Sequence, residues 1–362
     1  MILHSTASLR NHQTIQPIEQ MSKNAFVVSG GGSKGAFAVG VAKYLRDVHP
    51  EVGFDIFIGT STGSLVVPFV AIGELDLIKG IYTSVHTEDI ITKGNVLNRF
   101  MNHSCIFDVT PLWNVLQMHW TQARFDKLMA MPQAVFVTTV CLQTGGIVYW
   151  GNKDMVGNGQ FDVRKVTDRL EWLRAVLASA CQPVFMPPIE IRSTEAAPRQ
   201  YCDGGMREYI AMELAIGLGA TDVYGVALAP EADVLHNEKY TTAFGILETT
   251  IDRFSDDVGL NDVRVPSLIN NTLRRLDQVK QRMIADGVPQ AAIDAYFLAD
   301  AHDPFGNKAP INIHVLRPDG PLGGGPGGLT FDPVEMQGML DKGYARAQQF
   351  FMPAPAGDPT IV

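Results

Sequence analysis

The sequence is poor in cysteine and lacks a long uninterrupted apolar run. Its four cysteines, in 362 residues, form no CxxC pair and are too sparse for a disulfide scaffold, which suits a reducing compartment. The longest apolar run near the first motifs, 65–72, contains Pro68 and is far shorter than the roughly 20 residues of a spanning helix. The first 22 residues carry one basic residue, Arg10, and no apolar stretch of a signal peptide. We therefore expect no transmembrane segment and a cytoplasmic location, with secretion by a signal-independent route left open.

Basic residues are also in short supply. The chain has 38 acidic and 29 basic residues, a formal net charge of -9, and no Lys/Arg block. Electrostatic binding to nucleic acid or to an anionic lipid surface is therefore not favoured, and any lipid contact has to be apolar and local. With 46% hydrophobic residues the chain can bury a substantial core.

Short apolar runs, glycine-rich turns and helical patterns alternate along the chain. Residues 25–29 (AFVVS) precede GGGSKG, residues 54–58 precede GTSTG, and each turn leads into a helical pattern. Further strand candidates are 134–140, 147–150, 199–202, 222–228 and 311–316, with a helical pattern over 168–179. The alternation predicts an α/β fold with a parallel sheet flanked by helices. We expect one domain over 23–350, a flexible N-terminal arm over 1–22 and a C-terminal tail over 351–362.

The segment 59–63 reads GTSTG and matches the G-x-S-x-G pattern of a nucleophile elbow. In such an elbow the serine, here Ser61, sits on a strained turn between strand and helix, and Gly59 and Gly63 let the two elements approach. The helix that follows directs its N-terminal dipole at the serine. The alternative interpretation is a tight turn that merely contains a serine.

The segment 30–35 reads GGGSKG and has two interpretations. In a hydrolase, successive backbone N–H groups of Gly31 and Gly32 can converge on the oxygen of a tetrahedral intermediate. The same segment matches the G-x-G-x-x-G fingerprint of a dinucleotide-binding protein through Gly30, Gly32 and Gly35. Asp55 follows at about the expected spacing of 20 residues, but it falls at the start of its strand rather than at the carboxyl end.

Asp203 is followed by Gly204 and Gly205 and comes directly after the strand candidate 199–202. A carboxylate at a strand end points into the crevice at the carboxyl ends of a parallel sheet, where ligands of such folds bind. The alternative is a solvated turn, as we expect for the Asp-Gly pairs at 286–287 and 319–320.

The three motifs, in this order, resemble those of the patatin-like phospholipase family. Similar segments at 138–145, 178–188, 206–230 and 329–347 extend the likeness over about residues 24–350. The resemblance implies a three-layer α/β/α sandwich around a mostly parallel central sheet. It implies a lipid acyl hydrolase (phospholipase A, lysophospholipase or esterase) without metal or cofactor, with Ser61 as nucleophile, Asp203 as base and an oxyanion hole at Gly30, Gly31 and Gly32. The implied partner is a phospholipid or other acyl ester, with transient contact to a membrane surface.

Three alternatives and two local questions stay open. A Ser-Asp-His triad would use His236, His302 or His314, although His314 fits a strand better, and a dinucleotide-binding protein or a lipid-binding protein with an unreactive Ser61 would not hydrolyse esters. Pro68 should kink or shorten the helix after Ser61. The Met- and Trp-containing stretch 101–131 is a candidate lid over an acyl chain, with a plain core as its alternative. The oligomeric state is open.

Overall fold

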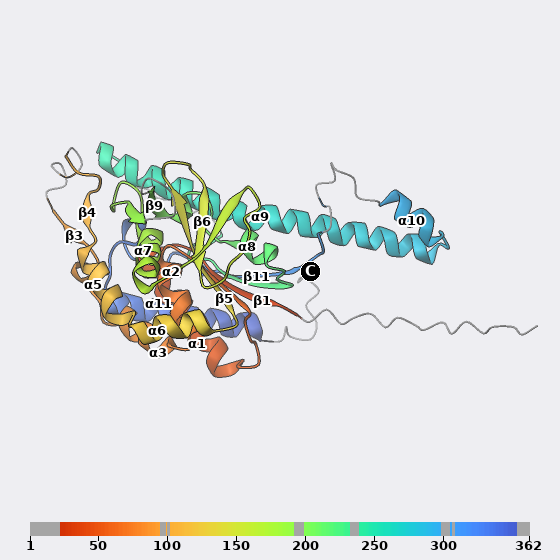
Figure 1. Ribbon diagram of the computed structural model, residues 1–362, viewed down its shortest axis with the longest axis horizontal. Helices are drawn as coiled ribbons and strands as arrows, with labels where there is room; N and C mark the ends of the chain where they lie inside the picture. Colours follow the sequence, from red (N-terminus) through yellow and green to blue (C-terminus); the bar gives the residue numbers. More distant parts are fainter. Residues whose placement is uncertain are drawn as a thin grey trace, which may run out of the picture.

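The computed structural model describes residues 22–94, 99, 102–191, 199–231, 239–297, 305 and 308–352. Its centre is a mostly parallel sheet (Figure 1). In spatial order the strands are β11 (Asn312–Leu316), β10 (Asp222–Val226), β1 (Asn24–Val28), β2 (Ile56–Thr60), β5 (Ala134–Cys141), β6 (Ile147–Gly151) and β7 (Phe161–Lys165). Strands β11 to β5 are parallel to their neighbours, whereas β6 runs antiparallel to β5. The predicted α/β class is confirmed.

Strand β9 (Arg199–Asp203) joins the sheet beside the end of β5. It pairs antiparallel with β5, where Asp203 lies opposite Thr139, and with the short strand β8 (Ile189–Ile191). The sequence predicted β9 but not β8 or β7. A separate two-stranded sheet consists of β3 (Thr92–Lys93) and β4 (Phe107–Asp108). The pairing of β9 with a central strand carries Asp203 to the middle of the fold.

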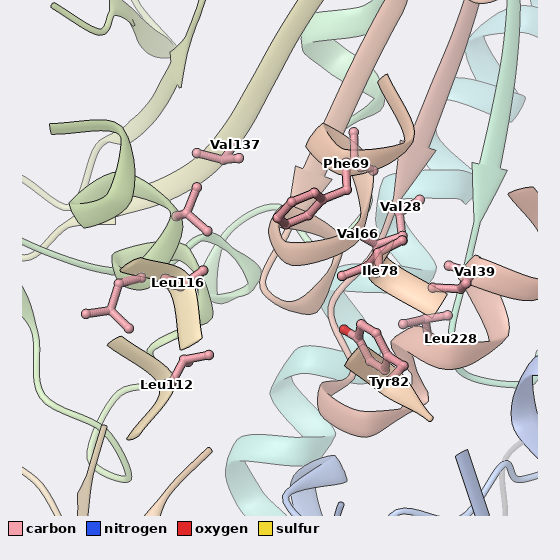
Figure 2. Close-up of a cluster of buried hydrophobic side chains, with 14 of the residues drawn as sticks. Val28, Val39, Val66, Phe69, Ile78, Tyr82, Leu112, Leu116, Val137 and Leu228 are labelled. Carbon is pink, nitrogen blue, oxygen red and sulfur yellow. The ribbon is translucent and has the colours of Figure 1, made fainter. Parts of the chain in front are cut away.

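The central strands are apolar on both faces. Phe26 and Val28 of β1 pack into one hydrophobic cluster, whereas Ala25 and Val27 pack into another on the opposite face. This explains the continuous apolar runs of the sequence, because parallel strands covered on both sides have no polar face. Figure 2 shows side chains of the larger cluster, including Val28, Val66 and Phe69.

One face of the sheet is covered by several helices, which contribute buried side chains to the larger cluster. They are α1 (Gly35–Val48), α2 (Thr62–Ala71), α3 (Leu75–Tyr82), α5 (Thr110–His119), α6 (Gln122–Ala130), α7 (Arg169–Ala180) and α11 (Pro333–Phe351). Helices α1 and α11 approach closely at two glycines. A Cβ atom at Gly40 would lie 2.0 Å from the Leu340 carbonyl oxygen, and one at Gly343 would lie 2.0 Å from that of Phe37.

The other face carries α8 (Met212–Gly217) and the long helix α9 (Ala243–Ala285), which is followed by α10 (Gln290–Tyr296). Figure 1 shows α9 crossing this side of the molecule and extending past the sheet. Helices on both faces of a mostly parallel sheet make the three-layer α/β/α arrangement that the resemblance implied. Between β1 and α11, 3-10 turns occur at Gly32–Lys34, Thr87–Asp89, Gly204–Met206 and Pro326–Gly328.

Several finer predictions can be placed on this fold. Pro68 lies inside α2, and that helix ends three residues later at Ala71. Apart from Ser22, Phe351 and Met352, the expected arm and tail fall outside the described residues. Among the described residues, no helix has the length and apolarity needed to cross a bilayer.

Candidate active site

Ser61 occupies a sharp turn between β2 and α2. Its backbone angles, φ 54° and ψ −122°, lie in a region that L-residues rarely adopt, and its N–H donates to the Ser179 hydroxyl at 3.0 Å. A Cβ atom at Gly59 would lie 2.2 Å from the Gly63 carbonyl oxygen, and one at Gly63 would lie 2.2 Å from that of Val28. Strand and helix therefore cross where only glycines fit, which is the geometry of a nucleophile elbow.

Asp203 lies at the end of β9 with 7% of its surface exposed. One carboxylate oxygen accepts the Gly205 N–H at 2.8 Å. Burial raises the pKa of Asp203 to about 6, while hydrogen bonds from the Ser61 hydroxyl and from Gly205 hold the pKa below what burial alone would give. The carboxyl group therefore changes protonation close to neutral pH and contacts the serine.

The glycines of the first motif lie beside this pair. Gly31 and Gly32 have φ angles of 148° and 58°, which favour glycine, and both line the same cleft as Ser61 and Asp203. At Gly30 a Cβ atom would lie 3.0 Å from the Cβ of Ser61. Residues from three separate strand ends, predicted independently, thus meet at one place.

The cleft over this site has a volume of about 980 Å³. Helix α9 forms one wall, and the glycine-rich segment 321–327 forms another. Leu65, Ile90, Leu112 and Phe331 line the cleft and also a smaller apolar cavity next to it. A cleft of this size with an apolar extension fits a ligand that carries a hydrocarbon chain.

No sequence pattern points to Tyr209, although its ring touches three backbone segments of the site. Cβ atoms at Gly30, Gly205 and Gly259 would lie 2.7, 2.8 and 3.0 Å from this ring. Tyr209 therefore packs against the first glycine motif, the loop after Asp203 and helix α9 at once. Only the folded structure brings these segments together, because a lone tyrosine near a turn carries no periodic pattern.

The segment 317–328 (RPDGPLGGGPGG) has the composition of a flexible loop, but it packs against the first glycine motif. A Cβ atom at Gly32 would lie 2.2 Å from the Gly328 carbonyl oxygen, and one at Gly328 would lie 2.3 Å from the Gly31 carbonyl oxygen. The two glycine-rich segments hold each other by backbone contact. The second segment is therefore a part of the site that its composition did not reveal.

Much of the candidate lid belongs to the core. Trp120, Phe125 and Leu128, from the stretch 101–131, are buried, and of its described residues Leu112 lines the cleft while Leu112, Val115, Leu116 and His119 line the smaller cavity. Helix α9, rather than the stretch 101–131, forms one wall of the cleft. The sequence suggested a lid from the Met and Trp content, but large side chains at helical spacing served core packing here.

The residues of the alternative interpretations lie elsewhere. Asp55 precedes β2, at the end opposite Gly59, and accepts the backbone N–H of Asn24 at 3.0 Å. A carboxylate there cannot reach a ribose bound at the carboxyl end of the strand. His314 lies on β11, stacked on Tyr224, with its Nε2 3.6 Å from an Asp222 oxygen, and is not among the cleft-lining residues that the structure describes. His236 and His302 fall outside the described residues.

Comparison with known proteins gives a family. The chain is 43% identical over 54 residues to the uncharacterized protein L620 of Acanthamoeba polyphaga mimivirus, a match that covers 14% of each chain. Superposition on the crystal structure of VipD from Legionella pneumophila gives a TM-score of 0.35 at 10% identity, covering 91% of this chain and 66% of VipD. The sequence model of the patatin-like phospholipases matches residues 26–216, more than half of the chain. The chain therefore belongs to the patatin-like phospholipase family.

Proposed function

We propose that the protein is a serine acyl hydrolase that cleaves lipid esters with a Ser61–Asp203 dyad, carried by one domain over residues 23–350. Family membership supports hydrolysis of lipid acyl esters in general. The observation that carries the finer proposal is that Ser61, on a strained turn, lines the same cleft as the buried Asp203 carboxyl, whose pKa its hydroxyl lowers, beside a glycine loop.

The geometry supports a two-step reaction. Ser61 Oγ attacks the ester carbonyl while Asp203 accepts its proton, and the backbone N–H groups of Gly31 and Gly32, with Gly30 beside Ser61, stabilise the negative oxygen. The alcohol leaves with the proton from Asp203, and Ser61 keeps the acyl group. A water molecule then attacks the acyl-enzyme, Asp203 takes its proton, and Ser61 is regenerated as the carboxylic acid departs. A base with a pKa near neutrality is well matched to both steps.

The cleft supports a lipid ester as the substrate. The oxyanion loop and the dyad lie at its floor, and the apolar side chains of Leu65, Leu112 and Phe331 continue from there into the smaller cavity. An acyl chain placed along these side chains would present its carbonyl carbon to Ser61. Burial of each methylene group would contribute about 0.8 kcal/mol to binding.

Covalent labelling with a fluorophosphonate probe tests the proposal. The wild-type chain should be labelled, and Ser61→Ala should lose both the label and ester hydrolysis by about 1000-fold or more. Ser255→Ala is the matched control, because Ser255 also lines the cleft and should keep its label. Label that survives Ser61→Ala would remove Ser61 as nucleophile. Loss of activity in a folded His314→Ala protein would support a Ser-Asp-His triad in place of the dyad.

A further inference from the structure

Helix α9 exposes large apolar side chains along one side, and the N-terminal part of this side borders the cleft. Phe254, Val265 and Leu268 have 69%, 53% and 69% of their surface exposed, whereas Gly259 and Leu273 on the inner face are buried. In Figure 1 the helix lies along the outside of the molecule and runs beyond the sheet. Single exposed apolar residues are ordinary, but a row of them along one helix indicates an interaction surface.

The row follows a heptad pattern. Core positions alternate in steps of four and three from Leu247 to Thr272, and we call this set the α9 seam: Leu247, Ile251, Phe254, Val258, Asn261, Val265, Leu268 and Thr272. The first position of each heptad is β-branched, at 251, 258, 265 and 272. The other core position of each heptad, at 247, 254, 261 and 268, holds Leu, Phe, Asn and Leu. Such spacing over several heptads, with polar residues at Asn261 and at the end position Thr272, is typical of a helix that pairs with another helix in a coiled coil.

The charges beside the seam indicate the partner. Asp257 and Arg264 are exposed and occupy equivalent positions one heptad apart on the same edge of the seam. In an antiparallel pair of identical helices, residues of this edge face their own counterparts. We propose that α9 pairs antiparallel with α9 of a second copy of this chain, around a two-fold axis close to Leu260, so that Asp257 faces Arg264 of the partner subunit and Arg264 faces the partner's Asp257.

The same charges select one register. A shift of one heptad in one direction places Asp257 against the partner's Asp257, and a shift in the other direction places Arg264 against the partner's Arg264. Both shifts oppose like charges. In the chosen register Asn261 faces Val258 of the partner subunit on either side of the axis, where a polar residue fixes alignment at some cost in stability. Pro266 falls outside the seam and leaves the contact surface uninterrupted.

A lipid surface suits this face less well than a second copy. Helix α9 carries six acidic and six basic residues and the chain has a net charge of -9, whereas helices that lie on membranes are rich in Lys and Arg. Leu247, Ile251 and Phe254 also line the catalytic cleft. The pairing therefore brings the partner's Val265 and the partner's Leu268 to the border of the cleft, and each copy extends the apolar wall of the other.

Sedimentation equilibrium of the full chain from 1 to 100 µM tests the pairing. We expect a concentration-dependent dimer in the wild type and a monomer in Val265→Glu/Leu268→Glu at every concentration, with an unchanged circular dichroism spectrum because both side chains are exposed. Ile284→Glu is the matched control, since Ile284 is 46% exposed on the same helix but lies off the seam, and it should still dimerise. A monomeric wild type at 100 µM, or a dimer that persists in the double variant, would overturn the proposal.

Two further experiments test the orientation. Asp257→Arg should weaken the dimer at least ten-fold, and the charge swap Asp257→Arg/Arg264→Asp should restore it. The four native cysteines are buried, so a mixture of Val258→Cys and Asn261→Cys chains should form a mixed disulfide across the seam. Val258→Cys chains that link efficiently to one another would instead indicate a parallel pair. Binding of the monomeric chain to phosphatidylcholine vesicles, lost in Val265→Glu/Leu268→Glu, would assign the face to lipid and contradict the dimer.

Discussion

At Asp203, burial and hydrogen bonding act in opposite directions on one carboxyl group. Burial raises its pKa from 3.8 to about 6, and donors from Ser61 and Gly205 moderate the rise. A carboxylate of ordinary pKa is a weak base at neutral pH, so the shift increases its ability to accept a proton. The buried environment therefore gives Asp203 part of the basicity that a histidine has in a triad.

The pH dependence of activity follows from that pKa. Asp203 must be ionised to accept the Ser61 proton, so kcat/KM should rise with pH through about 6 and level off above it. Asp203→Asn should lower kcat/KM by about 100-fold to 10,000-fold and remove the acidic limb. Asp252→Asn is the control, because Asp252 also lines the cleft and has a raised pKa but does not contact Ser61 in the proposed scheme. A limb that survives in Asp203→Asn would mean that another group is the base.

Gly32 tests the oxyanion loop with a control elsewhere in the chain. Its φ of 58° resembles the 68° of Gly145, but a Cβ atom at Gly32 would lie 2.2 Å from the Gly328 carbonyl oxygen, whereas one at Gly145 meets nothing within 4 Å. Gly32→Ala should therefore displace the loop and lower kcat by about 100-fold or more. Gly145→Ala pays only the backbone strain and should keep its kcat. Equal losses in esterase assays of the two variants would contradict a role of the loop in catalysis.

At the scale of elements, the sequence predicted most strands of the central sheet from their short apolar runs. Runs at 25–29 and 54–58 became β1 and β2 because both faces of these strands are buried. The sequence did not reveal α9, whose 43 residues include Pro266 and an even mixture of charges that resembles a loop when taken locally. Its packing against the loop after Asp203, against α8 and against the 3-10 turn at 326–328 stabilises it beside the cleft. Tertiary contacts stabilise this segment as a helix, although no local sequence pattern predicts it.

Asp262 joins α9 to the catalytic loop. One of its oxygens accepts the backbone N–H groups of Tyr209 and Ile210 at 2.6 and 2.9 Å. Asp262→Ala leaves both amides without this acceptor, so we expect a loss of about 1 to 3 kcal/mol in stability for each unpaired group and faster hydrogen exchange at Tyr209 and Ile210. A displaced loop also moves Asp203, which should lower kcat by up to about 100-fold.

Two variants distinguish the loss of these two hydrogen bonds from a general destabilisation of α9. Asp262→Asn keeps an oxygen acceptor and should recover most of the lost kcat. Asp277→Ala removes a carboxylate from the same helix at an exposed position and should change neither exchange nor activity. If Asp262→Ala exchanges at the wild-type rate, the two hydrogen bonds do not hold α9 to the loop.

At the scale of the whole molecule, two buried carboxyl groups and the half-buried one of Asp262 gather around the junction of the sheet, the loop after Asp203 and α9. Burial raises the pKa of Asp203 and of Asp262 to about 6, and raises that of Glu208 well above 4.5. Glu208 also accepts a hydrogen bond from the Tyr149 hydroxyl. The folded state therefore binds protons more tightly at these groups than the unfolded chain does.

Stability should consequently increase as the pH falls from 8 to 5. A carboxyl group whose pKa rises on folding contributes most below its unfolded pKa, and the contribution declines as the pH rises through the folded value. At Asp203 the shift of about 2 units corresponds to at most about 3 kcal/mol. Asp108 and Asp222, whose pKa values are lowered, oppose the trend only below about pH 4.

Urea unfolding at pH 5 and pH 8 measures this effect, and Asp203→Asn isolates one group within it. The variant cannot ionise, so it should gain stability at pH 8 and little at pH 5, and the difference between the two conditions should shrink by up to about 3 kcal/mol. Stability and activity then depend on pH in opposite directions, because hydrolysis requires the ionised form that burial disfavours. An Asp203→Asn protein that is no more stable than the wild type at pH 8 would show that the Ser61 and Gly205 hydrogen bonds fully offset the burial of the charge.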